Sequence, residues 1–348
     1  MRSMIFGAGS LGTILGALLT EGGADVTLVS RNAAHIRALQ QKGAIITGMM
    51  EKCVPVKACL PEELHGSYDL ILLMTKQQDN PGNVVRLLPR LQDGGGFCCL
   101  QNGIPELSLQ GVVPDKTILG GVIAWSATWQ GPGVSELTSP PDSVGVTLGS
   151  PFSPQVETML AQAAELLRQA GWVRIEEDIL SMRWSKLLVN ASVSALSSSL
   201  GLPCGGVTHD PKFQELSLRV LKECVDVGRA RGVQFRPVNG YPVAEALYFT
   251  DAAGLQRARE RMPEAFDSIR TSVSSILQDL RRGRTTEVEA ISGIVCRCGR
   301  ASGIPTPFND RVVDVIREIQ QGRRPCGPEN FAAYQELLAR PVAGKENE

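Results

Sequence analysis

Apolar and polar residues divide the first half of this 348-residue chain into alternating strand-like and helix-like blocks. The continuous apolar run Leu70–Met74 is typical of a strand buried on both faces of a parallel sheet. Amphipathic stretches such as Leu11–Glu21 and Ala34–Lys42 predict helices that cover those faces. Further strands are expected at Asp25–Val29, Ala44–Thr47, Gly96–Leu100 and Val173–Ile175, and further helices at Gly82–Leu91 and Gln155–Gln169. The pattern therefore predicts an α/β fold with a doubly wound parallel sheet.

The pattern changes twice along the second half of the chain. Residues 116–149 are rich in Val, Thr, Gly and Ser around a turn at Gln130–Gly133, which predicts hairpin strands at the edge of the sheet. Beyond Glu176 a helical period dominates, with helices expected at Ile179–Leu200, Pro211–Arg231, Pro242–Phe249, Glu264–Arg281, Glu287–Ala301, Pro307–Gln320 and, shorter, Glu329–Leu338. We expect an α/β domain over residues 1–176, an all-helical C-terminal domain over 177–325, and a partly disordered extension over 326–348.

A glycine motif stands between the first predicted strand and the first predicted helix. Its glycines, Gly7, Gly9 and Gly12, fit the pattern G-x-G-x-x-G. The first glycine permits a tight turn, the second admits a pyrophosphate against bare backbone, and the third lets helix and strand pack closely. Because the motif has this strand–turn–helix context, it predicts a Rossmann-type dinucleotide site, with a purely structural turn as the alternative. The contacting residues are expected to be Gly7, Ala8, Gly9, Ser10, Leu11 and Gly12.

The end of the second strand bears on which dinucleotide is bound. An NAD site has an Asp or Glu here for the ribose 2'-hydroxyl, whereas a nearby Arg accommodates a 2'-phosphate. This chain has Ser30, Arg31 and Asn32 at that point, with no carboxylate at the strand end. A guanidinium can grip a phosphate in a planar fork, so we predict NADP(H) as the cofactor. An ordinary surface arginine is the alternative.

Composition and charge exclude several classes of function. A net charge of −1 and a pI near 6.4 offer no general attraction to nucleic acid or to anionic membranes. No signal segment or 18-residue apolar span appears, so we expect a cytoplasmic protein. Nine cysteines lack paired C-x-x-C spacing and are expected to be reduced, and three scattered histidines support no metal site.

Candidate chemistry begins at the carboxyl ends of the predicted strands, where doubly wound sheets bind ligands. Lys76 follows the strand at Tyr68–Thr75, and Asn102 follows the strand at Gly96–Leu100. The alternative is that Lys76 solvates a loop and Asn102 caps a turn.

A reductase also needs a proton donor for the alkoxide that forms at a carbonyl. No tyrosine is followed four residues later by lysine, and no histidine stands beside a likely partner carboxylate, so lysine remains. Lys186, Asn190 and Ser194 recur at i, i+4 and i+8, which places them on one face of an otherwise apolar helix. Farther along, Glu287 stands at the start of a predicted helix, where the helix dipole alone could also favour a carboxylate.

Taken together and in order, these segments resemble the ketopantoate (2-dehydropantoate) 2-reductase family. The resemblance spans nearly everything from Ile5 to Gln320. It rests on the glycine motif, Ser30–Arg31, Lys76, Gln101–Gly103, Lys186-x-x-x-Asn190, Ser275–Asp279, Arg284–Glu287 and Gly303–Pro307.

The resemblance implies an NADP-dependent enzyme with Lys186 as general acid and Glu287 close to it and to the substrate hydroxyl. It further implies that Asn102, Asn190 and Ser275 hold a small 2-oxo acid, most simply 2-dehydropantoate, and that Lys76 lies beside cofactor and substrate. We also expect Asn102 to contact the cofactor and Ser194 to face the substrate. Ser194 departs from the family, whose established members usually carry a second asparagine there, and the chain is longer at its C-terminus. Both departures bear on the substrate.

Three alternatives stay open from the sequence. The chain could reduce another 2-oxo acid on the same scaffold, or act as a β-hydroxyacid dehydrogenase-like enzyme, since those enzymes share a Lys-x-x-x-Asn helix. It could also be a non-catalytic NADP-binding sensor, against which the retention of both Lys186 and Glu287 argues. Apolar helices in the second domain could cover a homodimer interface as easily as a core.

Overall fold

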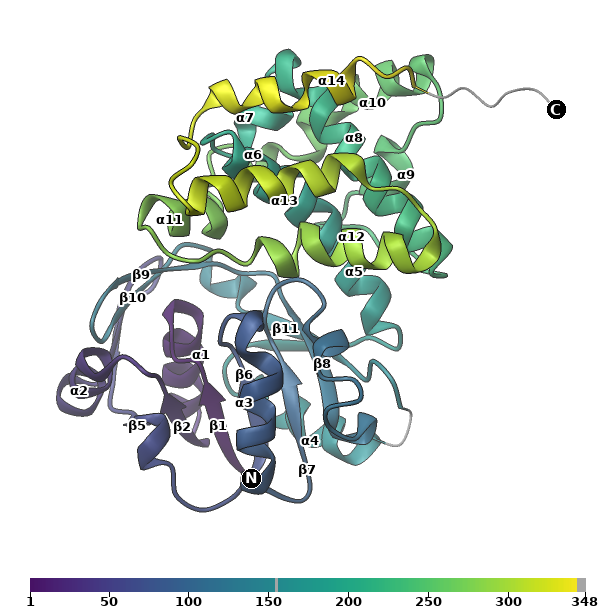
Figure 1. The fold of residues 1–348 in the computed structure, drawn as a ribbon. Helices are drawn as coiled ribbons and strands as arrows, with labels where there is room; N and C mark the ends of the chain where they lie inside the picture. Colours follow the sequence, from purple (N-terminus) through teal and green to yellow (C-terminus); the bar gives the residue numbers. More distant parts are fainter. Residues whose placement is uncertain (154–155, 343–348) are drawn as a thin grey trace. The chain divides into compact units, whose positions relative to one another are not determined.

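The computed structural model describes residues 1–153 and 156–342 and divides the chain into two compact units. The first unit is Met1–Leu180 and the second is Ser181–Glu348 (Figure 1). The sequence predicts the boundary after Glu176, and the structural division falls after Leu180. Across the described residues, no helix is both long enough and apolar enough to span a membrane.

The first unit is built on a doubly wound sheet, as predicted. Among the described residues, its strands are β1 (Arg2–Phe6), β2 (Asp25–Val29), β5 (Lys57–Cys59), β6 (Tyr68–Leu73), β7 (Leu91–Cys99), β8 (Ile118–Ile123), β11 (Gly145–Gly149) and β12 (Trp172–Ile175). Their order is β12-β11-β8-β7-β6-β1-β2-β5, and neighbours run parallel except for β8 and β11.

Alternating side chains bury both faces of this sheet. Met4 and Phe6 of β1 pack on one face with side chains of α3 (Asn80–Leu87), whereas Ile5 faces the opposite side. That opposite side is covered by α1 (Ser10–Glu21), α2 (Ala33–Lys42) and α4 (Glu157–Arg168). Burial on both faces explains why the strands read as continuous apolar runs, and the prediction of a two-sided sheet is confirmed.

The first unit also contains a second, smaller sheet, which the sequence does not predict. Strands β3 (Ala44–Gly48), β4 (Lys52–Val54), β9 (Ala127–Gly131) and β10 (Val134–Leu137) form a separate sheet in the order β4-β3-β10-β9. The predicted hairpin is present, since β9 and β10 pair antiparallel across the turn at Gln130–Gly133. Its predicted place at the edge of the main sheet is wrong, and Ala44–Gly48 does not join the main sheet either. The cause is long-range, because β3 pairs in parallel with β10, which lies some ninety residues later in the chain.

His35 anchors this second sheet to the first helices. The backbone N–H of Gly133, beside β10, donates to His35 Nδ1 at 2.9 Å, and His35 Nε2 lies 3.1 Å from the Thr13 hydroxyl of α1. Since Nδ1 accepts, the proton of the neutral ring sits on Nε2, on the side of the Thr13 hydroxyl. Burial lowers the pKa of His35, which favours this neutral form. His35 therefore has a structural role.

The second unit is helical. Its helices include α5 (Ile179–Val189, which starts in the first unit), α6 (Leu196–Ser199), α7 (Gly205–Thr208), α8 (Pro211–Ala230), α9 (Val243–Leu247), α10 (Ala252–Ala265), α11 (Ser275–Arg281), α12 (Ser292–Ser302), α13 (Pro307–Gln320) and α14 (Gln335–Leu338). The long helix α8 lies at the centre and contacts α7, α10, α12 and α13 (Figure 1).

Two predicted helices of this unit are wrong in their bounds. The stretch Glu264–Arg281 is broken, because the Ser274 hydroxyl accepts the Leu277 N–H at 3.1 Å and starts α11 afresh. Helix α10, before it, is absent from the sequence prediction, because its buried stripe of Leu255, Ala258 and Met262 is narrow and is surrounded by charged residues. The stretch Glu287–Ala301 begins instead with a short 3₁₀ turn, η9 (Val288–Ala290), and only then continues as α12.

The C-terminal residues pack onto the helical unit. A 3₁₀ segment, η10 (Pro328–Tyr334), precedes α14, and the buried Tyr334 hydroxyl lies 2.7 Å from the Ser199 hydroxyl. The Asn330 side-chain amide donates to the Ser199 carbonyl at 2.9 Å. The end of the extension that is predicted to be partly disordered, residues 343–348, lies outside the described residues.

Candidate functional site

The glycine loop has the geometry that its motif predicts. Gly7 adopts a φ of +115°, and a Cβ there would lie 2.4 Å from the Thr75 nitrogen. A Cβ on Gly12 would lie 2.5 Å from the Gly7 oxygen, so α1 packs directly on the loop. At Gly9 a Cβ would meet nothing within 4 Å. Gly9 is also the N-cap of α1 and has no side chain to occupy the first N–H groups, so the loop offers open space and free donors to an anion.

The residues after β2 are the second group of candidate cofactor-binding residues. Ser30 accepts a hydrogen bond from the Asn32 N–H at 3.3 Å, and Asn32 in turn caps α2 by accepting the His35 N–H. The Arg31 side chain is 79% exposed and lies 3.1 Å from a carboxylate oxygen of Asp79. An exposed ion pair of this kind is weak, so the Arg31 guanidinium can exchange Asp79 for a phosphate.

The sequence does not indicate that Asp79 lies beside Arg31. The strand end itself carries no carboxylate, as the sequence indicates, but the fold brings one from 48 residues later. Nothing local in the sequence signals this contact, because it depends on the pairing of β1 with both β2 and β6.

Lys76 and Asn102 follow neighbouring strands, and their loops are tied together. The Gln77 side-chain amide donates to the Asn102 carbonyl. The Gln101 amide donates to the Thr75 carbonyl at 2.8 Å and to the Asn80 side chain at 2.6 Å. These bonds hold the two strand ends at one edge of the sheet, beside the glycine loop that follows β1. The network residues Gln77, Asn80 and Gln101 were not predicted as functional.

In the second unit, Lys186 and Asn190 lie on one continuous helical run with an irregular turn. Helix α5 is followed by a π-helical segment, η7 (Asn190–Ala195), and then by α6. Such π segments interrupt helices frequently at functional sites. The Asn190 amide nitrogen is buried and has no hydrogen-bond partner among the described residues. A buried amide without an acceptor is costly, which makes it a candidate to bind a ligand oxygen.

The pKa of Lys186 is unusually low for a lysine. Burial, and secondarily the positive charge of Arg183, lower the pKa of Lys186 from 10.5 to about 8. Arg183 is one helical turn away and its side chain is only 2% exposed. A lysine with a pKa of about 8 is still mostly protonated at neutral pH, yet it gives up its proton more readily than an ordinary lysine.

Ser194 lies in the π-helical segment, and Ser275 lies at the start of α11. The Ser194 side chain contacts the Cys204 thiol, and its carbonyl accepts the Ser198 hydroxyl at 2.6 Å. Ser275 is exposed at the first position of α11, directly after the N-cap Ser274. The Ser198 and Ser274 hydroxyls lie 2.6 Å apart, so a hydrogen-bond chain links the π-helical segment to the start of α11.

Glu287 is half-buried between two buried neighbours, Thr286 and Val288. It is the residue before the turn η9, which packs on α12, and α12 in turn contacts the π-helical segment. The carboxylate is thus carried by an irregular connection rather than by the start of a long helix.

The two halves of the chain match two models of one protein family. Residues 3–149 match a model described as ketopantoate reductase PanE/ApbA. Residues 178–320 match a model described as its C-terminal part. The two matches leave only a short connection and the chain ends unassigned.

Individual relatives agree with the family models. The chain is 27% identical over 335 residues to a 2-dehydropantoate 2-reductase of Pyrococcus abyssi, covering 93% of this chain and 100% of the relative. A solved 2-dehydropantoate 2-reductase of Geobacter metallireducens has a TM-score of 0.78 at 25% identity, covering 91% of this chain and 99% of that one. A D-mandelate dehydrogenase solved with NADH and anilino(oxo)acetate also has a TM-score of 0.78, at 22% identity, with 93% and 99% covered, and shares the fold.

Proposed function

Because the chain belongs to the ketopantoate reductase family of oxidoreductases, we propose that it reduces 2-dehydropantoate to pantoate with NADPH, as in pantothenate biosynthesis. The observation that carries the proposal is Lys186, a partly buried lysine whose pKa is lowered to about 8, next to the unsatisfied amide of Asn190. Relatives named 2-dehydropantoate 2-reductase support this substrate, at 27% identity.

The cofactor would be held by the first unit. The positive φ of Gly7, the open space at Gly9 and the N–H groups at the start of α1 fit a pyrophosphate. Ser30 and Arg31 would hold the 2'-phosphate, and Lys76 would lie near the nicotinamide end. When bound, NADPH supplies a hydride to the carbonyl carbon of the substrate.

The second unit would supply the proton. Lys186 would donate its ammonium proton to the carbonyl oxygen as negative charge forms there, which leaves an alcohol and a neutral lysine. Asn190 and Ser275, with Asn102 from the first unit, would hold the substrate, and Ser194 would border it. Glu287 would accept a hydrogen bond from the substrate hydroxyl and lie close to Lys186. The proposal therefore needs both units, since hydride and proton come from different halves of the chain.

A panel assay tests the proposal. Purified protein is mixed with NADPH and with 2-dehydropantoate, other branched 2-oxo acids or the aromatic phenylglyoxylate, and NADPH oxidation is followed. We expect 2-dehydropantoate to have the highest kcat/KM. A different 2-oxo acid that is better by ~100-fold, or about 2.7 kcal/mol in transition-state binding, would reassign the substrate but keep the reductase.

A second candidate keeps the scaffold and changes the substrate. Ser194, which stands where the family usually has asparagine, offers one donor in place of two and contacts Cys204. A pocket reshaped there could favour a 2-oxo acid of different bulk, which the same panel would detect.

The variant Lys186→Ala distinguishes an enzyme from a non-catalytic NADP-binding sensor. Removal of a general acid should lower turnover by roughly 10²- to 10⁴-fold with NADPH affinity nearly unchanged. A variant with full turnover would remove Lys186 from the mechanism.

A further inference from the structure

The connection that carries Glu287 has little secondary structure of its own. It runs from the end of α11 to the start of α12, and Glu287 has a φ of −96° and a ψ of 24°. Its internal bonds include those of a short turn, from the Ala290 N–H to the Glu287 carbonyl at 2.9 Å and from the Ile291 N–H to the Val288 carbonyl at 3.2 Å, and one from the Val288 N–H to the Thr286 hydroxyl at 3.4 Å. The position of Glu287 therefore depends on contacts from elsewhere in the unit.

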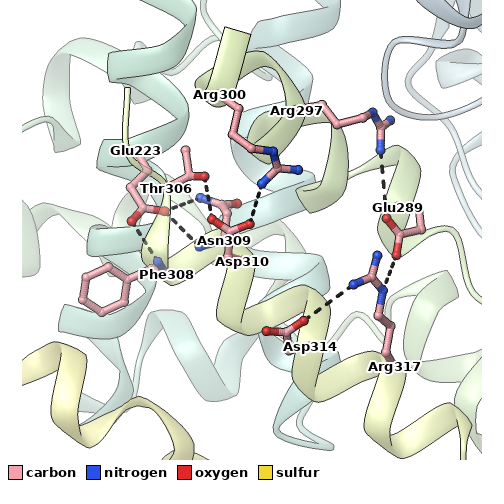
Figure 2. A network of polar contacts seen from close by, with 10 residues as sticks. All are labelled: Glu223, Glu289, Arg297, Arg300, Thr306, Phe308, Asn309, Asp310, Asp314 and Arg317. Carbon is pink, nitrogen blue, oxygen red and sulfur yellow. Dashed lines mark hydrogen bonds and ion pairs between the residues drawn. The ribbon is translucent and has the colours of Figure 1, made fainter. Parts of the chain in front are cut away.

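Helix α13 supplies such contacts on both sides of Glu287. On one side, the Thr286 N–H donates to the side-chain oxygen of Gln320 at 2.6 Å. On the other side, Arg317 Nε donates to Glu289 at 2.6 Å, and Arg297 lies 3.9 Å from the same carboxylate (Figure 2). Gln320 and Arg317 are three residues apart, so one face of α13 reaches Thr286 and Glu289, one on each side of Glu287.

The other end of α13 is fixed by a buried carboxylate. Glu223 of α8 accepts the N–H groups of Phe308 at 2.8 Å and Asn309 at 2.9 Å, and the Asn309 side-chain amide at 2.8 Å (Figure 2). These are the first N–H groups of the helix, which a carboxylate satisfies favourably. Burial raises the pKa of Glu223 to about 7, although the three N–H donors oppose the shift. With its N-terminus bound to α8, α13 can hold the Glu287 connection in a defined place.

We propose that Gln320, and to a lesser extent Arg317, are positioning residues that orient the Glu287 carboxylate for the reduction. The inference rests on the proposed function, in which Glu287 contacts the substrate. Gln320 has the larger effect because its loss leaves a partly buried backbone N–H without an acceptor. The Arg317–Glu289 pair is about half exposed on each side and is correspondingly weak.

The test compares Gln320→Ala with Gln321→Ala in the full-length enzyme with NADPH and 2-dehydropantoate. Both glutamines are exposed, but Gln320 is the one that accepts the Thr286 N–H. We expect Gln320→Ala to lower kcat by about 10-fold, with the Kd for NADPH unchanged. Gln320→Glu keeps an acceptor oxygen and should restore most of the activity. Arg317→Ala should lower kcat by about 2- to 3-fold, with the exposed Arg311→Ala as its control.

A double-mutant cycle with Glu287→Gln decides whether Gln320 acts through Glu287. If it does, adding Gln320→Ala to Glu287→Gln costs little further turnover. Equal losses in both backgrounds, or full activity of Gln320→Ala beside an impaired Glu287→Gln, would overturn the inference while leaving the proposed function intact. Full activity of Glu287→Gln itself would remove the role of Glu287 in the proposed function, and the inference with it. Faster amide exchange at Thr286 in Gln320→Ala would verify that the bond was lost.

Discussion

Replacing Lys186 with methionine should stabilise the fold while it lowers turnover by at least roughly 10²-fold. Methionine keeps much of the length of lysine but carries no charge to desolvate. The pKa of Lys186 falls from 10.5 to about 8, and at 1.36 kcal/mol for each pKa unit this amounts to roughly 3 kcal/mol. The folded state bears that cost whenever the lysine is charged.

The pH dependence follows from the direction of this shift. Below pH 8 the lysine is charged in the folded and the unfolded protein, so the cost is fully present. Between about 8 and 10.5 the folded protein has released the proton while the unfolded protein still holds it, and the cost declines as pH rises. The stability advantage of Lys186→Met should therefore be about 1–3 kcal/mol at pH 7, after some discount for residual exposure, and should nearly vanish above pH 10.5.

Urea unfolding of the apo protein, followed by fluorescence and circular dichroism at pH 7, 9 and 10.5, measures this difference. Lys212→Met, which removes an exposed lysine of the same unit, serves as the control. A Lys186→Met protein that is less stable than the wild type at pH 7, or whose advantage does not change with pH, would show that Lys186 is not held in a desolvated charged state.

Further predictions concern the cofactor, the pH profile and the substrate pocket. Arg31→Ala should weaken NADPH binding by roughly 1.5–3 kcal/mol, measured calorimetrically, with NADH little affected; equal weakening of both would refute the assignment. Asp79→Asn removes a carboxylate 3.1 Å from Arg31 and should tighten NADPH binding by about 2- to 5-fold, without tightening NADH; no change would mean that Asp79 does not compete with the phosphate. The kcat/KM for reduction should fall above pH 8 as Lys186 loses its proton, and a flat profile to pH 10 would argue against this donor. Ser194→Asn should be neutral or modestly favourable in kcat/KM for 2-dehydropantoate, since one neutral hydrogen bond is worth only about 0.5–1.5 kcal/mol; a large loss would indicate a pocket adapted to another acid.

The main sheet could be predicted from the sequence because its signals are local. Continuous apolar runs encode burial on both faces, and Gly7 and Gly12 mark points where a Cβ would clash with backbone. The second sheet could not be predicted in this way, since β3 and β10 meet only through tertiary pairing.

In the candidate site, too, features carried by one element could be predicted, whereas contacts between distant segments could not. Lys186 and Asn190 could be identified because one helix carries them, but the π-helical segment at Asn190 leaves no recognisable sequence signal. Asp79 beside Arg31 and Gln320 beside Thr286 are contacts between distant segments, and no local pattern predicts them. The roles of the predicted site residues remain predictions that the proposed variants test.

The most direct test of the central claim is a product analysis with two proteins. Wild type and Lys186→Met are each incubated with NADPH and 2-dehydropantoate, and the pantoate formed is quantified by mass spectrometry against the NADPH consumed. The account predicts one pantoate for each NADPH with the wild type, and a rate at least roughly 10²-fold lower with the variant. Absence of pantoate with the wild type, or undiminished formation by Lys186→Met, would contradict it.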